Sequence, residues 1–113
     1  MTDAAIDRTT YDALVATAGA EFVGELVDTF LAEAPRMLDD MRDALAKGDA
    51  ERFRRAAHSL KSNAHTFGAL KLGAMAKALE LGGFAFAKAG APVAEAADEY
   101  GRAAAELKEL AHG

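Results

Sequence analysis

The chain has 113 residues, a formal net charge of −5 and no cysteine. This length suits one domain with a sizeable core, and the absence of cysteine excludes disulfides, thiolate catalysis and cysteine-ligated metals. The acidic balance disfavours nucleic acid as a partner. No stretch approaches the roughly 18 apolar residues that a membrane span needs, and the first ten residues do not resemble a signal peptide. We therefore expect a cytoplasmic protein without a membrane partner.

The spacing of apolar residues predicts helices throughout. Alanine, leucine and glutamate are frequent, and apolar residues recur every three or four positions. A short first helix is expected to begin at Thr9 or Thr10, which would cap it, and to end at Gly19. A long second helix follows over about residues 21–47.

Glycine and aspartate mark the next boundary. Gly48 ends the second helix and Asp49 caps the third, which runs to about Phe67 and stops at Gly68.

The fourth helix begins near Leu70, and Gly82 and Gly83 weaken its far end. Residues 88–92 form a turn, and Pro92 suits the first turn of a last helix. Long helices joined by short loops pack antiparallel to their neighbours. The sequence therefore predicts one all-α domain over residues 1–113, an antiparallel up-down-up-down four-helix bundle with a short additional N-terminal helix.

One histidine of the third helix is predicted to face away from the core. At 100° per residue, the apolar residues of this helix fall within about 40° of one direction, and His58 lies about 140° from it. The apolar stripe consists of Phe53, Ala57, Leu60, Ala64 and Phe67. This geometry disfavours a buried core histidine. An incidental histidine on a solvated polar face remains an alternative.

A carboxylate is expected at the same height as His58. If the third and fourth helices meet at Gly68, His58 lies ten residues before the turn and Glu80 twelve after it. A carboxylate there can accept the Nδ1 hydrogen of the imidazole and leave Nε2 with its lone pair outward. The alternative is that Glu80 is a plain surface acid.

Basic residues surround His58 on its own helix. Lys61 lies one turn after it, and Arg54 and Arg55 lie one turn before it. Positive charge beside a nucleophilic imidazole suits an incoming anion, most often a phosphoryl group. A solvated charged face is the alternative explanation of these bases.

At this point the residues resemble a known family. The segment "AHSLKSNAHTFGALKLGAMAKALE", residues 57–80, resembles the signature of histidine-containing phosphotransfer (HPt) domains of bacterial two-component phosphorelays. Nine positions stand in the register of that signature: His58, Leu60, Lys61, Ser62, Gly68, Ala69, Leu72, Leu79 and Glu80. The preceding segment, "LVDTFLAEAPRMLDDMRDALAKGD", is also similar to the family.

The resemblance implies a phosphorelay intermediate. His58 would accept a phosphoryl group from a receiver-domain aspartyl phosphate and pass it to the aspartate of a response regulator. Lys61 would help to neutralise the phosphate, Glu80 would orient the ring, and the small Ser62 would leave space for the partner. Receiver domains of a hybrid histidine kinase and of response regulators would be the partners and would supply Mg²⁺, so the chain needs no cofactor. We expect a monomer, and no autophosphorylation from ATP because no phosphate-binding loop is present.

Two positions depart from the family's pattern. Ser62 stands where glycine is frequent, and His65 stands where a small residue is usual. His65 lies about 20° from His58 and two turns along, so it is expected to flank the docking surface or to act as a weak alternative acceptor, unless it is an incidental polar residue. The candidate docking surface consists of Ser59, Ser62, Arg54, Arg55, His65, Leu14 and Val15.

Three other functions are alternatives to phosphotransfer, and two of them are disfavoured. A plain helical adaptor would keep its function in a His58→Gln variant, because glutamine preserves size and polarity but cannot be phosphorylated. A metal site of His58, His65 and Glu51 is disfavoured, since histidines seven positions apart on a helix lie about 10 Å apart. A hydrolase is disfavoured because no serine or cysteine nucleophile with an orienting acid stands near His58.

Overall fold

All the regular secondary structure of the described residues is helical, which confirms the predicted all-α class. The computed structural model describes residues 4–87 and 91–113, and no strand occurs among them. In chain order the helices are α1 (Arg8–Ala18), α2 (Ala20–Lys47), α3 (Ala50–Thr66), α4 (Leu70–Ala87) and α5 (Ala91–His112).

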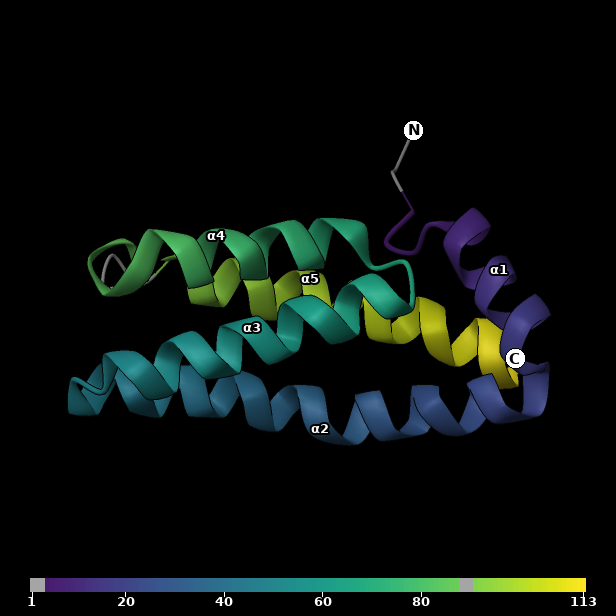
Figure 1. Ribbon diagram of the computed structural model, residues 1–113, viewed down its shortest axis with the longest axis horizontal. Coiled ribbons are helices and arrows are strands. Elements are labelled where there is room, and N and C mark those ends of the chain that lie inside the picture. Colours follow the sequence, from purple (N-terminus) through teal and green to yellow (C-terminus); the bar gives the residue numbers. More distant parts are fainter. Residues whose placement is uncertain (1–3, 88–90) are drawn as a thin grey trace.

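The four long helices pack in a ring around the core. α3 contacts α2 and α4, and α5 contacts the same two helices, so each of the four has two neighbours. Figure 1 shows α2 and α3 side by side, with α4 and α5 beyond them and α1 at the end where α2 begins. The middle of α3 therefore has solvent on one side and the core on the other.

The apolar stripe predicted for α3 forms part of this core. Each of its members is at most 3% exposed: Phe53, Ala57, Leu60, Ala64 and Phe67. Asp49 starts the helix, as predicted, by accepting a hydrogen bond from the backbone N–H of Arg52 at 3.1 Å. Burial of the stripe fixes the rotation of α3 and turns the opposite face outward.

The cap of α1 differs from the prediction. Asp7 is the N-cap, and its carboxylate accepts hydrogen bonds from the backbone N–H and the hydroxyl of Thr10 at 3.1 and 2.6 Å. The prediction of Thr9 or Thr10 was wrong because Asp7 stands three residues before Thr10. At that spacing its side-chain oxygen reaches an unpaired N–H of the first turn.

The turn between α3 and α4 is tied to the N-terminal segment. The carbonyl of Gly68 accepts a hydrogen bond from the N–H of Asp7 at 2.7 Å. Gly68 has φ +84°, and a Cβ there would lie 2.7 Å from the carbonyl oxygen of Asp7. Glycine is required here both by its backbone conformation and by the close approach.

The end of the bundle opposite α1, where α4 ends and α5 begins, also agrees with the predictions from the sequence. Gly83 leaves helical geometry, with φ 73° and ψ −165°, as expected of a glycine pair in a helix. Pro92 is the second residue of α5, as predicted. The turn predicted over residues 88–92 lies in part outside the described residues.

Glu99 of α5 is an exception to the apolar pattern: it is 4% exposed and pairs with Arg102 at 2.9 Å.

Candidate functional site

His58 projects from the middle of α3 into solvent. Its side chain is 55% exposed, whereas Ala57 before it and Leu60 after it are fully buried. The outward orientation predicted from helical periodicity is therefore confirmed. A partner protein can reach this imidazole without any movement of the core.

Glu80 approaches His58 from the neighbouring helix. Leu79 is buried on the core side of α4, and the next residue, Glu80, lies at the margin that faces α3. The Nδ1 atom of His58 and Oε2 of Glu80 lie 2.8 Å apart. The predicted contact is therefore present. With a proton on Nδ1, the ring donates a hydrogen bond to the carboxylate and Nε2 keeps its lone pair.

The same carboxylate holds Lys61. The Nζ atom of Lys61 lies 2.7 Å from Oε1 of Glu80, and the two side chains are 23% and 11% exposed. Hydrogen bonds from Lys61 and, to a smaller extent, from His58 lower the pKa of Glu80 below its ordinary value, although burial opposes this shift. Glu80 therefore stays ionised, with a cation on one oxygen and an imidazole on the other.

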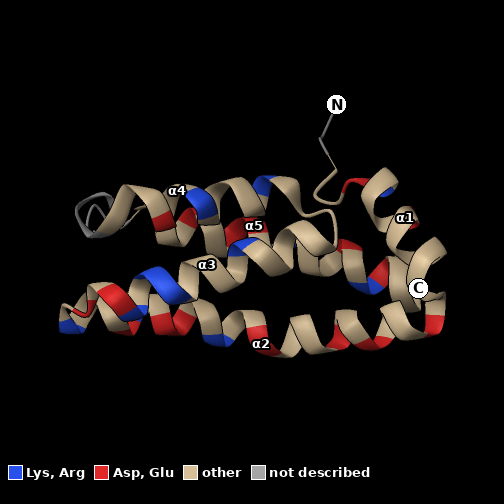
Figure 2. Cartoon of the chain, viewed as in Figure 1, with Lys and Arg blue, Asp and Glu red and all other residues tan. Residues whose placement is uncertain are grey.

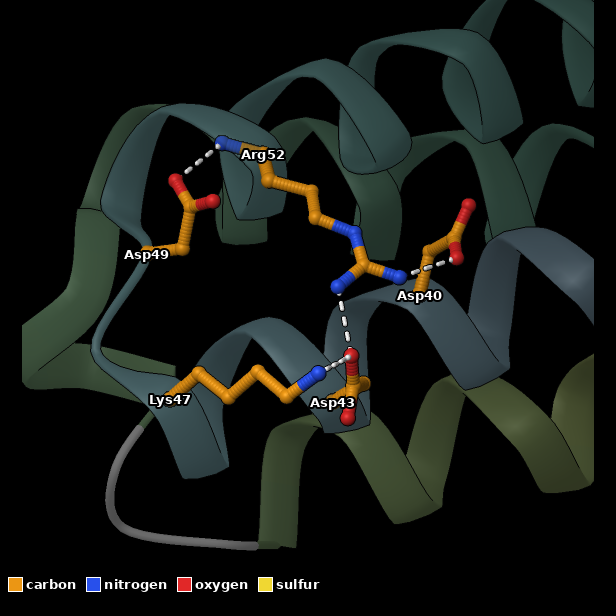
Figure 3. Close-up of polar contacts among 5 residues, drawn as sticks. All are labelled: Asp40, Asp43, Lys47, Asp49 and Arg52. Atoms are coloured by element: carbon orange, nitrogen blue, oxygen red, sulfur yellow. Dashed lines mark hydrogen bonds and ion pairs between the residues drawn. The ribbon is translucent and has the colours of Figure 1, made fainter.

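The arginine nearest the start of α3, Arg52, is paired with acids of α2. The guanidinium of Arg52 contacts Asp40 of α2 at 2.7 Å and also binds Asp43, which in turn binds Lys47 (Figure 3). Arg52 thus joins α3 to α2. Figure 2 shows basic segments of α3 beside acidic segments of α2, in agreement with this pairing.

The other two bases differ in their partners. Arg54 binds Glu51, one turn earlier on the same helix, at 2.6 Å. Arg55 is exposed and forms no ion pair with any residue in the described ranges 4–87 and 91–113. The positive charge expected around His58 is therefore partly neutralised within the chain, and Arg55 is the arginine left to meet a partner.

A groove of about 290 Å³ lies between α2 and α3. Its lining residues are Met37, Asp40, Arg52, Arg55, Ala56 and Ser59. Ser59 directly follows His58 but points about 100° away from it, so the groove lies on the α2 side of α3 while the imidazole contacts Glu80 of α4. Ser62 is exposed one turn after His58. Both predicted serines and Arg55 therefore lie on the surface around the histidine.

His65 packs on the backbone of α4. A Cβ built on Gly73 would lie 2.4 Å from both Cδ2 and Nε2 of the His65 ring, so the ring lies directly over this glycine. Gly73 was not among the residues predicted from the sequence. The signal was present, since a glycine inside a strongly helical segment indicates a close approach of another group.

Leu14 and Val15 lie apart from the other candidates. Both are partly buried and pack against the core from α1. α1 is held at the end of the bundle where Asp7 meets Gly68 (Figure 1). The structure does not bring these two residues together with His58, because α1 lies at one end of the bundle whereas His58 lies in the middle of α3.

The residues of the disfavoured metal site all lie in the part of the chain that the structure describes. No group of three or more histidine, cysteine, aspartate or glutamate side chains is placed there to hold a metal ion. Glu51, a member of the disfavoured metal site, is engaged by Arg54.

The fold and these contacts define a class of protein: a helical domain in which the exposed imidazole of His58 is held at Nδ1 by a carboxylate from the next helix. The family model of the Hpt domain matches residues 25–113, more than half of the chain, so the chain belongs to the Hpt domain family. Membership implies histidine phosphotransfer within a phosphorelay, and Hpt domains interact with receiver domains. No curated protein and no solved structure matches the chain. Among the described helices, none is both long and apolar enough to cross a membrane.

Proposed function

We propose that this Hpt domain is a phosphorelay intermediate in which His58 carries the phosphoryl group. The observation that supports this most is the 2.8 Å contact between Nδ1 of His58 and Oε2 of Glu80. It occupies one ring nitrogen and leaves Nε2 as the nitrogen available to a partner. The 55% exposure of the side chain is what a docking receiver domain requires.

The transfer is a substitution at phosphorus. The lone pair of Nε2 attacks the phosphorus of an aspartyl phosphate, the P–N bond forms, and the P–O bond to the aspartate breaks, with the electron pair leaving on the carboxylate. The ring becomes positively charged while Nδ1 keeps its proton. Glu80 stabilises that charge through the hydrogen bond. Attack by the aspartate of a response regulator on the phosphohistidine reverses these steps.

Lys61 has two roles in the transfer: it interacts with Glu80, and it favours the approach of the phosphoryl group. Before transfer it neutralises Glu80, which keeps the carboxylate ionised beside His58. It stands one turn from His58 on the same helix, so its ammonium group also lowers the cost of bringing a phosphoryl group to the ring. Mg²⁺ and the acidic residues that bind it belong to the receiver domain, and the domain needs no cofactor and no ATP of its own.

The docking surface proposed for receiver domains surrounds His58. It comprises Ser59, Ser62, Arg55 and the groove between α2 and α3, with Arg54 at its edge. Receiver domains of a hybrid histidine kinase and of response regulators would dock here in turn, which suits a monomer acting in the cytoplasm. The antiparallel up-down-up-down order of α2 to α5 is part of this proposal. The ring of helix contacts and the short connections around Gly48 and Gly68 support it.

Phosphotransfer from labelled receiver domains tests the proposal. The wild-type domain is mixed with a receiver that carries ³²P-labelled aspartyl phosphate, and the label on the domain is tested for the acid lability and alkali stability of phosphohistidine. We expect label on the wild type and none on His58→Gln. No transfer from any receiver of the organism would exclude a carrier and favour a plain adaptor. Transfer to His58→Gln would show that another residue accepts the phosphoryl group, with His65 as the first candidate.

A further inference from the structure

Two histidines of α3 contact α4 along the line where these two helices pack, and the two contacts are seven residues apart on each helix. His58 meets Glu80, and His65 meets Gly73. The second contact lies seven residues further along α3 and seven residues back along α4. We call this line, from His58 and Glu80 to His65 and Gly73, the α3–α4 seam. His65 is therefore the next group on the seam after the phosphoacceptor.

The two contacts leave the rings in different positions. The His58 ring stands out beside a carboxylate, with more than half of its side chain exposed. The His65 ring lies over Gly73, which is buried, and a single added methyl group would come within 2.4 Å of it. Only a residue without a side chain lets the ring lie this close to α4.

His65 lies within reach of any partner that covers His58. Seven residues of α-helix span about 10 Å and end about 20° from the starting direction. A transient or standard protein interface buries about 600–800 Å² on each partner, which corresponds to a patch of roughly 15 Å radius. A patch of this size centred on His58 includes His65.

We infer that the footprint of the docked receiver domain runs along the α3–α4 seam as far as His65, and that Gly73 permits this docking. Gly73 acts through His65, because it lets the ring lie flat against α4. A side chain at position 73 would push the ring outward, in nearly the same direction as His58, into the path of the partner. This inference rests on the proposed function and adds that Gly73 keeps the His65 ring clear of the docked partner.

Two variants and a matched control separate this effect from a change in folding. Gly73→Ala displaces the ring, and His65→Ala combined with Gly73→Ala removes the ring that is displaced. Gly101→Ala makes the same chemical change within α5, where a Cβ meets no atom within 4 Å. For each protein, the half-saturating concentration of phosphorylated receiver and the maximal transfer rate are measured. The imidazole signals of His58 and His65 are recorded by ¹H–¹³C NMR.

The inference predicts a binding defect without a chemical defect. Gly73→Ala is expected to shift the His65 signals, to leave the His58 signals and the maximal rate unchanged, and to raise the half-saturating concentration about threefold to tenfold. The double variant is expected to return within about twofold of wild type, and Gly101→Ala to match wild type. In a titration of the wild-type domain with unphosphorylated receiver, the signals of both histidines should shift.

Specific results would overturn the inference. An unchanged half-saturating concentration in Gly73→Ala would do so, as would a double variant that stays impaired. If Gly73→Ala does not fold, the wild-type titration decides, and a shift of His58 without a shift of His65 counts against the footprint. A wild-type domain that accepts no label from any receiver overturns the proposed function as well. Normal wild-type transfer with no effect at Gly73 overturns the docking inference alone.

Discussion

His58 and Glu80 stand 22 positions apart in the sequence, yet Nδ1 and Oε2 lie 2.8 Å apart between α3 and α4. The other oxygen of the same carboxylate binds Lys61 at 2.7 Å. Only 11% of the Glu80 side chain is exposed, so the carboxylate makes both contacts where little water competes with them. Glu80 therefore links the nucleophile to the cation that accompanies it.

Loss of the charge on Glu80 should slow phosphotransfer. In Glu80→Gln the amide oxygen still accepts the Nδ1 hydrogen, but a neutral acceptor stabilises the positive ring less than a carboxylate does. We expect the initial rate of label transfer from a phosphorylated receiver to fall about tenfold. Glu109→Gln, the same change at an exposed acid of α5, should leave the rate unchanged. Equal rates for Glu80→Gln and wild type would remove the positioning role of this residue.

Lys61 should control the ionisation of Glu80. It is the largest cause of the lowered pKa of that carboxyl group, and burial acts in the opposite direction. In Lys61→Met the hydrogen bond that offsets the effect of burial is removed, so we expect the pKa of Glu80 to rise. Carboxyl ¹³C NMR over a pH titration measures it. Lys77→Met, at an exposed lysine of α4, should leave that titration as in wild type, and an unchanged Glu80 titration in Lys61→Met contradicts the assignment.

Acid should weaken the fold through Glu80. Its pKa in the folded protein lies below the ordinary value of 4.5, so the unfolded chain binds the proton more tightly. The resulting stabilisation is fully present above about pH 4.5 and is lost as the pH falls through the folded-state pKa. Urea unfolding of wild type and Glu80→Gln at several pH values tests this. The difference in their free energies of unfolding should shrink on acidification, and a constant difference would contradict the lowered pKa.

The turn at Gly68 should tolerate no side chain. Its φ of +84° disfavours other residues, and a Cβ would lie 2.7 Å from the carbonyl oxygen of Asp7. We expect Gly68→Ala to lower the free energy of unfolding by about 2 kcal/mol. Gly101→Ala, inside α5 with open space around it, should instead raise it by about 0.5–1 kcal/mol. Urea denaturation distinguishes the two, and similar values for both variants would rule out a special role for the turn.

Local periodicity explains what the sequence could predict. The rotation of 100° per residue depends only on the helix, so it predicted both the buried stripe of α3 and the exposure of His58. The contact between His58 and Glu80 needed one more fact. A short turn at Gly68 determines which residues of α3 and α4 share a height, and glycine is readable as a helix stop.

The partners of the charged side chains could not be predicted in this way. Arg54 interacts electrostatically with both Glu51 and Glu80 and forms an ion pair with Glu51, whereas Arg55 beside it forms no ion pair in the described part of the chain. That choice depends on rotamers and on neighbouring helices. The cap at Asp7 was missed because its register with Thr10 competes with a cap at Thr9 or Thr10 itself. The burial of Glu99 also has no signal in the apolar pattern.

Arg52 and Arg55 line the same groove but should fail in different ways when replaced by alanine. Arg52 binds Asp40 and Asp43, so Arg52→Ala removes a link between α2 and α3 and is expected to lower the free energy of unfolding. Receiver binding should change less than in Arg55→Ala, because these two carboxylates already neutralise the Arg52 guanidinium. Arg55 has no ion pair within the described residues, so Arg55→Ala should leave stability unchanged.

Arg55→Ala should instead weaken the binding of a receiver domain. An arginine at the rim of an interface speeds association with an acidic partner, and the magnesium-binding face of a receiver domain is acidic. The dissociation constant for a receiver should rise about threefold at low salt and approach the wild-type value at high salt, because salt screens exposed charges. Titration calorimetry at two salt concentrations measures both values, and urea unfolding measures stability. A defect in Arg55→Ala that persists at high salt, or an equal docking defect in Arg52→Ala, would contradict an electrostatic role specific to Arg55.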